Sequence, residues 1–175
     1  MKRFLLILLV LISFPTLAQE SIINVFLGSR DVPVSIYAGP VGNEPITQIC
    51  ESTETDRWNS ILIKGKSAHR FNVDIYTQED KYISDVWIDR SECAVYVNFW
   101  YDWDKWCLYD SPDIGYPCAS FDTANLEYDV SFLYILDYVV INSYTTWFNV
   151  GFMYKGKYYE GWTKDVCRDI NHSCH

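Results

Sequence analysis

The sequence has little positive charge. Its 175 residues include 14 lysines and arginines against 23 aspartates and glutamates, which gives a formal net charge of −9. Phosphate binding needs a concentrated lysine and arginine surface, so this balance argues against a nucleic-acid partner. Beyond residue 18 the longest apolar stretches, such as 130–141, are broken by Asp137 and fall short of the roughly 20 residues that span a bilayer. We therefore expect a chain that neither binds nucleic acid nor spans a membrane.

Motifs of catalysis are also missing. The chain has no G-x-S-x-G sequence, and His69 is the only histidine outside the C-terminal tail. Carboxylate pairs such as Asp102 with Asp104, or Asp110 with Asp113, have no diagnostic spacing for a glycosidase and are common in acidic loops. The sequence therefore predicts a protein that is not an enzyme and that uses no cofactor.

No stretch shows a sustained helical period with capping residues. Residues 71–76, 31–37 and 129–140 instead alternate with a period of two, in β-branched and aromatic residues that suit a pleated, half-buried surface. The glycines in 63–67 and 154–158 predict tight hairpins, because glycine readily adopts the positive φ of such turns. The pattern predicts an all-β fold.

The start of the chain has the layout of a secretory signal peptide. Lys2 and Arg3 precede an apolar run, and small residues lead to a cleavage point near Ala18. Cleavage there removes two cations, so the net charge of the mature chain falls to about −11. We expect a periplasmic or secreted protein.

An even number of cysteines in an exported chain predicts disulfides. The C-terminal tail also carries His172 and His175, and with two of the cysteines these could hold zinc or copper. An oxidising compartment favours disulfide bonding over metal binding, so we expect no metal. The six cysteines are Cys50, Cys93, Cys107, Cys118, Cys167 and Cys174.

The chain contains an internal repeat. Residues 36–46 and 108–118 share an aliphatic residue, a tyrosine, a small residue before proline and a second proline, at an offset of 72. The segments that end at Cys93 and Cys167 also match, with a strand, a turn, an acidic residue and a tryptophan in the same order. We divide the chain into a signal peptide (1–18), a first β module (19–97), an aromatic join (98–103) and a second β module (104–175).

The second module resembles bacterial Src-homology-3-like (SH3-like, SH3b) domains. After the proline-bearing "LYDSP", it has a W-x-x-V strand, a G-K turn and a closing G-W strand, made by Trp147, Val150, Gly156, Lys157, Gly161 and Trp162. The first module departs from this pattern, with Val86 at the glycine position and no tryptophan at the Trp147 position. The resemblance implies two small SH3-like barrels in tandem, usually non-catalytic, which bind cell-wall peptides or other proteins.

The same resemblance implies where a ligand binds. The family holds its partners in an aromatic groove between the loop after the first strand and the loop before the closing strand. The matching residues are Tyr109, Tyr116, Trp147 and Trp162, with Asp110 and Asp113 adding negative charge. Such a groove favours a ligand with apolar bulk and a positive group, such as a lysine-bearing peptide. The alternative is that Trp147 and Trp162 are plain core residues.

The join between the modules has two interpretations. Continued alternation places Phe99, Tyr101 and Trp103 on one face and Trp100, Asp102, Asp104 and Trp106 on the other. The rings either seal the interface between the modules or form an exposed platform, in which Trp100, Trp103 and Trp106 stack against a ligand and the paired aspartates accept its hydrogen bonds.

Equivalent modules predict a symmetric set of disulfides: Cys50–Cys93 in the first module and Cys118–Cys167 in the second. In the family the first and last strands lie side by side, which implies Cys107–Cys174 as the third bridge.

Two functions remain open at this point. The first is a binding module of the bacterial envelope that recognises a peptidoglycan peptide or an envelope protein. The second is a periplasmic immunity or inhibitor protein that neutralises an exported toxin or enzyme, since the acidity of the chain steers it toward a basic target.

Overall fold

The computed structural model describes residues 23–54, 57–97, 105–123, 126, 130, 132–164 and 166–167. Strands make up 61% of these residues and form one large antiparallel sheet, which confirms the all-β prediction. Within the described ranges, no helix has the length and apolar character needed to cross a membrane. The predicted signal peptide and the aromatic join at 98–103 lie outside the described residues.

The strands fall into two halves. The first half contains β1 (Ile23–Leu27), β2 (Val34–Tyr37), β3 (Thr47–Ile49), β4 (Ser60–Lys66), β5 (Arg70–Tyr76) and β6 (Tyr82–Asp89). After a 3-10 turn, η1 (Arg90–Glu92), the second half contains β7 (Cys93–Val97), β8 (Lys105–Tyr109), β9 (Pro117–Asp122), β10 (Leu133–Asn142), β11 (Thr145–Tyr154) and β12 (Lys157–Thr163). A short strand, β13 (Val166–Cys167), pairs with β7.

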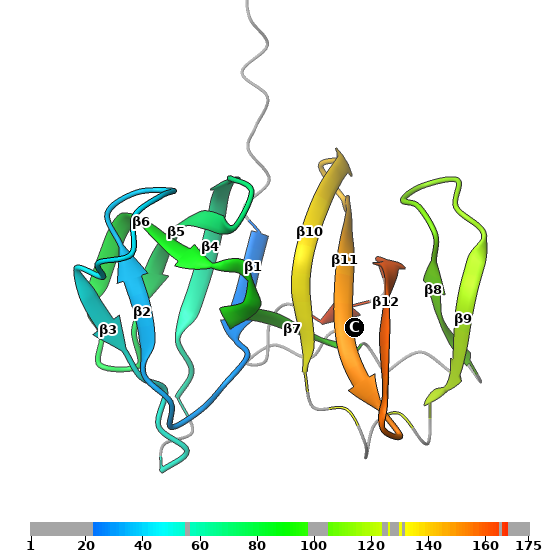
Figure 1. Cartoon of the computed structure of the whole chain (residues 1–175), viewed down its shortest axis with the longest axis horizontal. Coiled ribbons are helices and arrows are strands. Elements are labelled where there is room, and N and C mark those ends of the chain that lie inside the picture. The colour runs from blue at the N-terminus through cyan, green and yellow to red at the C-terminus, as the bar shows by residue number, and fades with distance from the viewer. Residues whose placement is uncertain are drawn as a thin grey trace, which may run out of the picture.

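The two halves have the same topology. Counted outward from the junction of β1 and β7, the strand order is β1-β4-β5-β6-β2-β3 in the first half and β7-β10-β11-β12-β8-β9 in the second half. Each strand of the second half thus occupies the place of the strand numbered six lower in the first half. An antiparallel pair of β1 and β7 joins them through Phe26 and Ala94. In Figure 1 the first half lies on the left and the second on the right, with β7 running between them. The strand β7, which the sequence repeat assigned to the first module, occupies in the second half the place that β1 occupies in the first.

The hairpin predictions fare differently. Lys155 and Gly156 turn between β11 and β12 with φ values of 49° and 75°, so the hairpin at 154–158 forms as predicted. Gly65 lies within β4 beside a register shift, and the chain turns after Lys66 instead. The prediction at 63–67 therefore identified the right hairpin but placed its turn too early.

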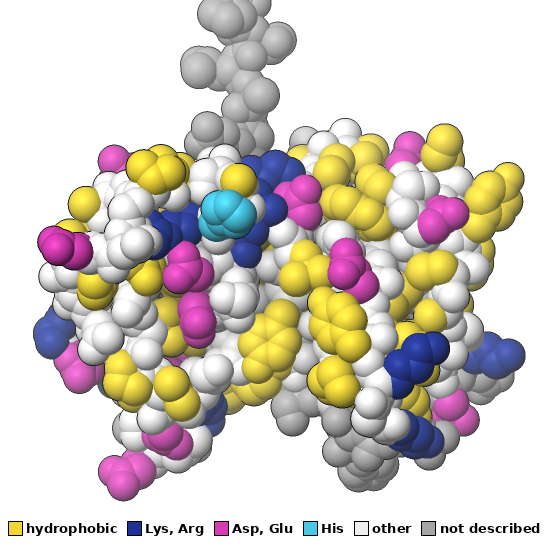
Figure 2. Space-filling model, viewed as in Figure 1, with side chains coloured by type: hydrophobic (Ala, Val, Ile, Leu, Met, Phe, Trp, Pro, Cys, Tyr) yellow, Lys and Arg dark blue, Asp and Glu magenta, His cyan; other side chains and the backbone are white. Residues whose placement is uncertain are grey.

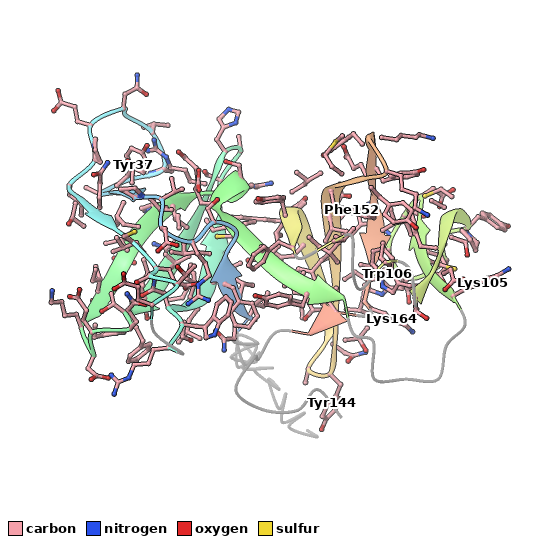
Figure 3. The ribbon with its side chains drawn as sticks, turned by 90° about the horizontal axis from the view of Figure 1, so that it is seen from below. Tyr37, Lys105, Trp106, Tyr144, Phe152 and Lys164 are labelled. Carbon is pink, nitrogen blue, oxygen red and sulfur yellow. The ribbon has the colours of Figure 1, made fainter. Side chains whose placement is uncertain are left out.

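A single hydrophobic cluster fills both halves. It is built from the inward-facing positions of the alternating strands, such as Phe71, Val73 and Ile75 on β5. Trp106 belongs to it: the residue is 1% exposed, and its ring centroid lies 5.8 Å from that of Phe152. Figure 3 labels both residues in the second half, seen from below. Of the residues considered for an exposed platform at the join, Trp106 is thus a core residue.

A charged cluster fixes the contact between the halves. Asp137 accepts hydrogen bonds at 2.7 Å from Lys66 Nζ and at 2.9 Å from the Tyr138 backbone N–H. Arg90, in η1, lies 3.6 Å from the same carboxylate oxygen and donates to the Leu136 carbonyl at 2.8 Å. The register of β10 against β11 shifts between Ile135 and Asp137, so this carboxylate lies at an irregularity of the strand.

A second charged cluster lies inside the first half. Glu51 is fully buried, accepts a hydrogen bond from the Asn59 backbone N–H at 2.9 Å and lies 3.4 Å from Arg30 Nε. The guanidinium group of Arg30 in turn covers the ring of Trp58 at 4.1 Å. Burial raises the pKa of the Glu51 carboxyl, and the hydrogen bond from Asn59 and the charge of Arg30 offset only part of this.

The described cysteines do not pair with one another. Cys50 follows the edge strand β3 and is exposed, whereas Cys93 is fully buried at the start of β7, with five strands between them in the sheet order. The predicted Cys50–Cys93 disulfide is therefore wrong. Cys107 and Cys118 are also free thiols in the structure, and the side chains of their predicted partners, Cys174 and Cys167, lie outside the described residues.

We predict that Asp137→Asn loosens the junction. Asparagine keeps an oxygen for the Tyr138 N–H but loses the attraction to Lys66 and Arg90, so the free energy of unfolding should fall by about 1 kcal/mol. Urea denaturation at low and high salt measures this, and the loss should shrink as salt screens the pair. Asp113→Asn, in an exposed loop, is the matched control and should leave stability unchanged. Equal effects of the two variants would contradict the proposed role of Asp137.

We also predict opposite pH dependences for two carboxyl groups. The raised pKa of Glu51 means that its contribution to stability is greatest below its ordinary pKa of 4.5 and falls as pH rises through the folded-state pKa. Hydrogen bonds from Thr53 lower the pKa of Asp31, so its contribution is lost as pH falls. As pH rises from 3 to 7, the free energy of unfolding of the wild type should fall relative to that of Glu51→Gln and rise relative to that of Asp31→Asn. Parallel curves from urea denaturation would contradict both assignments.

Candidate ligand-binding face

Three strands of the second half place a row of side chains on the side of the sheet away from the core. Trp162 on β12 lies opposite Tyr109 on β8 and opposite Asn149 on β11. Directly opposed residues point to the same side, with Cβ atoms about 4.5–5.5 Å apart. All three side chains are half-buried, whereas the flanking Gly161 and Thr163 are buried on the core side. The row therefore presents the phenol ring of Tyr109, the indole of Trp162 and the amide of Asn149 next to one another.

Trp147 closes one end of this row. Its ring meets the ring of Tyr109 edge to face, with centroids 5.4 Å apart and an interplanar angle of 87°. Only 5% of Trp147 is exposed, and the ammonium group of Lys164 lies 5.8 Å from its ring centroid. Trp147 thus supports Tyr109 and is itself covered.

A carboxylate lies on the same side of β12 as the indole. Glu160 is on β12, two residues before Trp162, and its Oε1 accepts a hydrogen bond from Asn149 Nδ2 at 3.3 Å. It is exposed and makes no ion pair with any cation in the described part of the chain. Burial and the nearby charge of Glu160 both raise the pKa of Tyr158. We call Tyr109, Trp147, Asn149, Glu160 and Trp162 the second-half face.

The loop between β8 and β9 borders this face. Asp110 closes the loop: its Oδ1 accepts a hydrogen bond from the Tyr116 N–H at 2.9 Å, and its own N–H donates to the Tyr116 carbonyl at 3.0 Å. Tyr116 is 79% exposed, and Asp113 is exposed with a φ of 68°. The loop therefore offers one open ring and one open carboxylate, while Asp110 has a structural role.

The structure brings together part of the predicted groove. Tyr109, Trp147 and Trp162 lie in contact or in register on one face, and the loop of Asp110, Asp113 and Tyr116 follows directly from Tyr109. Trp147 and Trp162 lie on the outward side of the sheet. The predicted ligand residues Trp100 and Trp103 lie outside the described residues.

Sequence reasoning missed Asn149 and Glu160, although a signal was present. The triplet Phe-Asn-Val occurs at 71–73 and again at 148–150, and in both places the asparagine is the outward residue between two buried ones. Because outward positions on a sheet are free to vary, the repetition of this asparagine makes it a candidate site residue.

The corresponding region of the first half has a small cavity of about 460 Å³. Arg70 occupies the strand position of Trp147, and its guanidinium lies 3.3 Å from the ring of Tyr37. It also donates to Asp89 at 2.8 Å and to the carbonyls of Gly39 and Gly42 at 3.1 and 2.7 Å. These bonds fix the loop between β2 and β3. The cavity is lined by Tyr37, Pro40, Val41, Gly42, Asn43, His69, Arg70 and Asp89.

Hydrophobic and acidic side chains lie together on the surface of the second half. In Figure 2 yellow side chains gather over β10 and β11 with magenta acidic side chains among them, and dark blue side chains lie over the lower part of β12. The loops between β2 and β3 and between β8 and β9 both lie at the upper edge in Figure 1.

Comparison with protein-family models, curated proteins and solved structures finds no match to this chain.

We predict that the close approach of β8 to β12 depends on Gly161. A Cβ atom there would lie 2.9 Å from Leu108 Cβ and 3.1 Å from the Tyr109 carbonyl oxygen. Gly161→Ala should therefore push β8 outward, lower the free energy of unfolding by about 1–3 kcal/mol and disturb the Tyr109–Trp162 pair. Gly65→Ala is the matched control, since the nearest atom is 3.7 Å away. Equal melting temperatures for the two variants would show that Gly161 does not set this contact.

Proposed function

We propose that this chain is an exported, non-catalytic binding protein of the bacterial envelope, built from two SH3-like units, and that its second-half face binds a peptide through a lysine ammonium group. The observation that carries the proposal is the carboxylate of Glu160, which makes no ion pair within the described residues and lies on the same side of β12 as the indole of Trp162, opposite Tyr109. A cell-wall peptide or a lysine-bearing loop of an envelope protein supplies this group.

The chemistry of the face fits a cation. An ammonium group over an aromatic ring gains about 0.5–2 kcal/mol, and a neighbouring carboxylate adds charge pairing. The chain already places its own cations in this way, with Arg30 4.1 Å from the Trp58 ring and Lys164 5.8 Å from the Trp147 ring. The indole of Trp162 lies opposite Tyr109 and on the same side of β12 as Glu160. No cation of the described residues lies over this indole. A ligand can supply the missing charge.

Several features support the SH3-like interpretation. Each half has six strands in the same order, and in each half a proline-bearing loop follows the strand that carries the tyrosine of the face. The duplication explains why the motifs of the second half recur in weaker form in the first. Export is supported by the layout of residues 1–18.

We predict that Tyr116→Ala weakens binding without destabilising the fold. The ring is 79% exposed, so its loss should leave the melting temperature nearly unchanged and weaken binding by about 2- to 30-fold, the range of one cation–π contact. The probe is the stem peptide Ala–Glu–Lys–Ala, titrated by calorimetry. Tyr144→Ala, which removes a ring that is 95% exposed in the turn between β10 and β11, is the matched control and should bind as wild type does.

The class of partner is decided by capture from the native envelope. Retention on purified peptidoglycan, lost in Glu160→Gln, identifies the cell-wall peptide. Recovery of one protein at equal stoichiometry identifies a protein partner, and a basic toxin or enzyme would make the chain its inhibitor, in keeping with the net charge of −9. Failure to retain either class, or retention that Glu160→Gln leaves unchanged, would overturn the proposal.

A further inference from the structure

The face of the second half has a counterpart in the first half. Trp87 on β6 lies opposite Tyr37 on β2 and opposite Asn72 on β5, as Trp162 lies opposite Tyr109 and Asn149. Asn72 Nδ2 donates to Asp85 Oδ1 at 3.2 Å, which matches the 3.3 Å bond from Asn149 to Glu160. We call Tyr37, Asn72, Asp85 and Trp87 the first-half face.

The repetition is not explained by folding alone. Core positions must stay apolar in both halves, but outward positions of a sheet carry no such constraint. The two halves differ at neighbouring outward positions, where Arg70 stands in place of Trp147 and Asp74 in place of Gly151. A tyrosine, a tryptophan, an asparagine and a carboxylate are nevertheless retained together, with the same hydrogen bond. The pattern indicates a common binding role.

The first-half face differs in having two cations of its own chain: Arg70 lies 3.3 Å from the Tyr37 ring, and a lysine lies beside the carboxylate. Lys64 Nζ lies 3.4 Å from Asp85 Oδ1 and 2.6 Å from Asp74 Oδ1. Lys64 sits in β4 at a register shift between Ile63 and Gly65. The matching shift in β10 falls between Ile135 and Asp137, and the residue there is Leu136. The second half therefore has a leucine where the first half has its own ammonium group.

We propose that the first-half face is a second site for the same ligand group, a peptide lysine ammonium, and that Lys64 attenuates it by occupying Asp85. This inference rests on the proposed function of the second-half face. Asp85 is 81% exposed on its side chain, so an incoming ammonium group reaches it from solvent. Lys64 keeps its shorter contact with Asp74 when the ligand takes Asp85. The chain is then bivalent, with a stronger site on the second half and a weaker one on the first.

Two sites of unequal strength suit a partner that presents the same group repeatedly. Binding at the stronger site holds the chain near further copies, and the weaker site then engages at a high effective concentration. A cross-linked polymer that carries many lysine-bearing peptides meets this condition, whereas a single short peptide does not. The geometry points to a repeating ligand.

The test uses fluorine NMR of the full mature chain labelled with 5-fluorotryptophan. The probe is the stem peptide Ala–Glu–Lys–Ala, and Trp87→Phe, Trp162→Phe and Trp58→Phe assign the resonances. Titration should shift the Trp162 signal first and the Trp87 signal at higher peptide concentration. The Trp58 signal is the internal control and should stay in place, since Arg30 already covers that ring.

Lys64 and Leu136 occupy matching strand positions, so removing the charge from one and adding it to the other tests the role of this ammonium group in both halves. Lys64→Gln should tighten binding at Trp87 by about 5-fold, the equivalent of about 1 kcal/mol for one surface ion pair, and leave Trp162 unchanged. Leu136→Lys should weaken binding at Trp162 by a similar factor. Thermal melting of each variant confirms that it folds.

The outcomes separate the two proposals. If Trp162 shifts, Trp87 stays still and Lys64→Gln changes nothing, the second site is wrong while the proposed function stands. If no tryptophan shifts although the protein is retained on peptidoglycan, both faces are wrong as the site of contact. If neither the peptide nor peptidoglycan is bound, the proposed function itself fails, and the second site fails with it.

Discussion

The pairing of β7 with strands of both halves is the constraint on which the rest of the structure depends. β7 completes the row of strands in the second half, and its antiparallel pair with β1 turns two six-stranded units into one sheet. Asp137 reinforces this junction. Its carboxylate accepts a hydrogen bond from Lys66 of the first half and forms an ion pair with Arg90 in the turn that leads into β7. The two outward faces are therefore held by the same sheet and not by a flexible linker.

The two halves show which parts of the fold tolerate change. Most inward positions are aliphatic or aromatic in both halves, with exceptions on β12, where Gly161 and Thr163 stand on the core side in place of Val86 and Ile88. Val86 and Gly161 occupy matching positions, and the glycine allows β8 to lie close to β12, where a side chain would collide with Leu108. At the matching ends of the faces, the guanidinium group of Arg70 lies over the Tyr37 ring, and the rings of Trp147 and Tyr109 meet edge to face. Different residues thus perform the same supporting task.

Much of the fold was readable from the sequence, because period-two alternation and turn glycines act locally. The strand around Phe71, Val73 and Ile75 and the hairpin at Gly156 follow from these signals alone. The Cys50–Cys93 pairing could not be predicted correctly, since it depends on which strands lie between distant cysteines. Of the candidate site, the aromatic residues were found from their motif. Asn149, Glu160 and the role of Lys64 were not, because only strand register shows which side chains meet.

The sharing of β7 also imposes an order of assembly. A chain synthesised from its N-terminus delivers β1 to β6 before any strand of the second half, and those six strands are mutually adjacent in the sheet. The second half, in contrast, needs β7 in place beside β10 before its own row is complete, and β7 is positioned by β1. A first half that folds first would therefore offer β1 as the template for β7 and, through β7, for the second half.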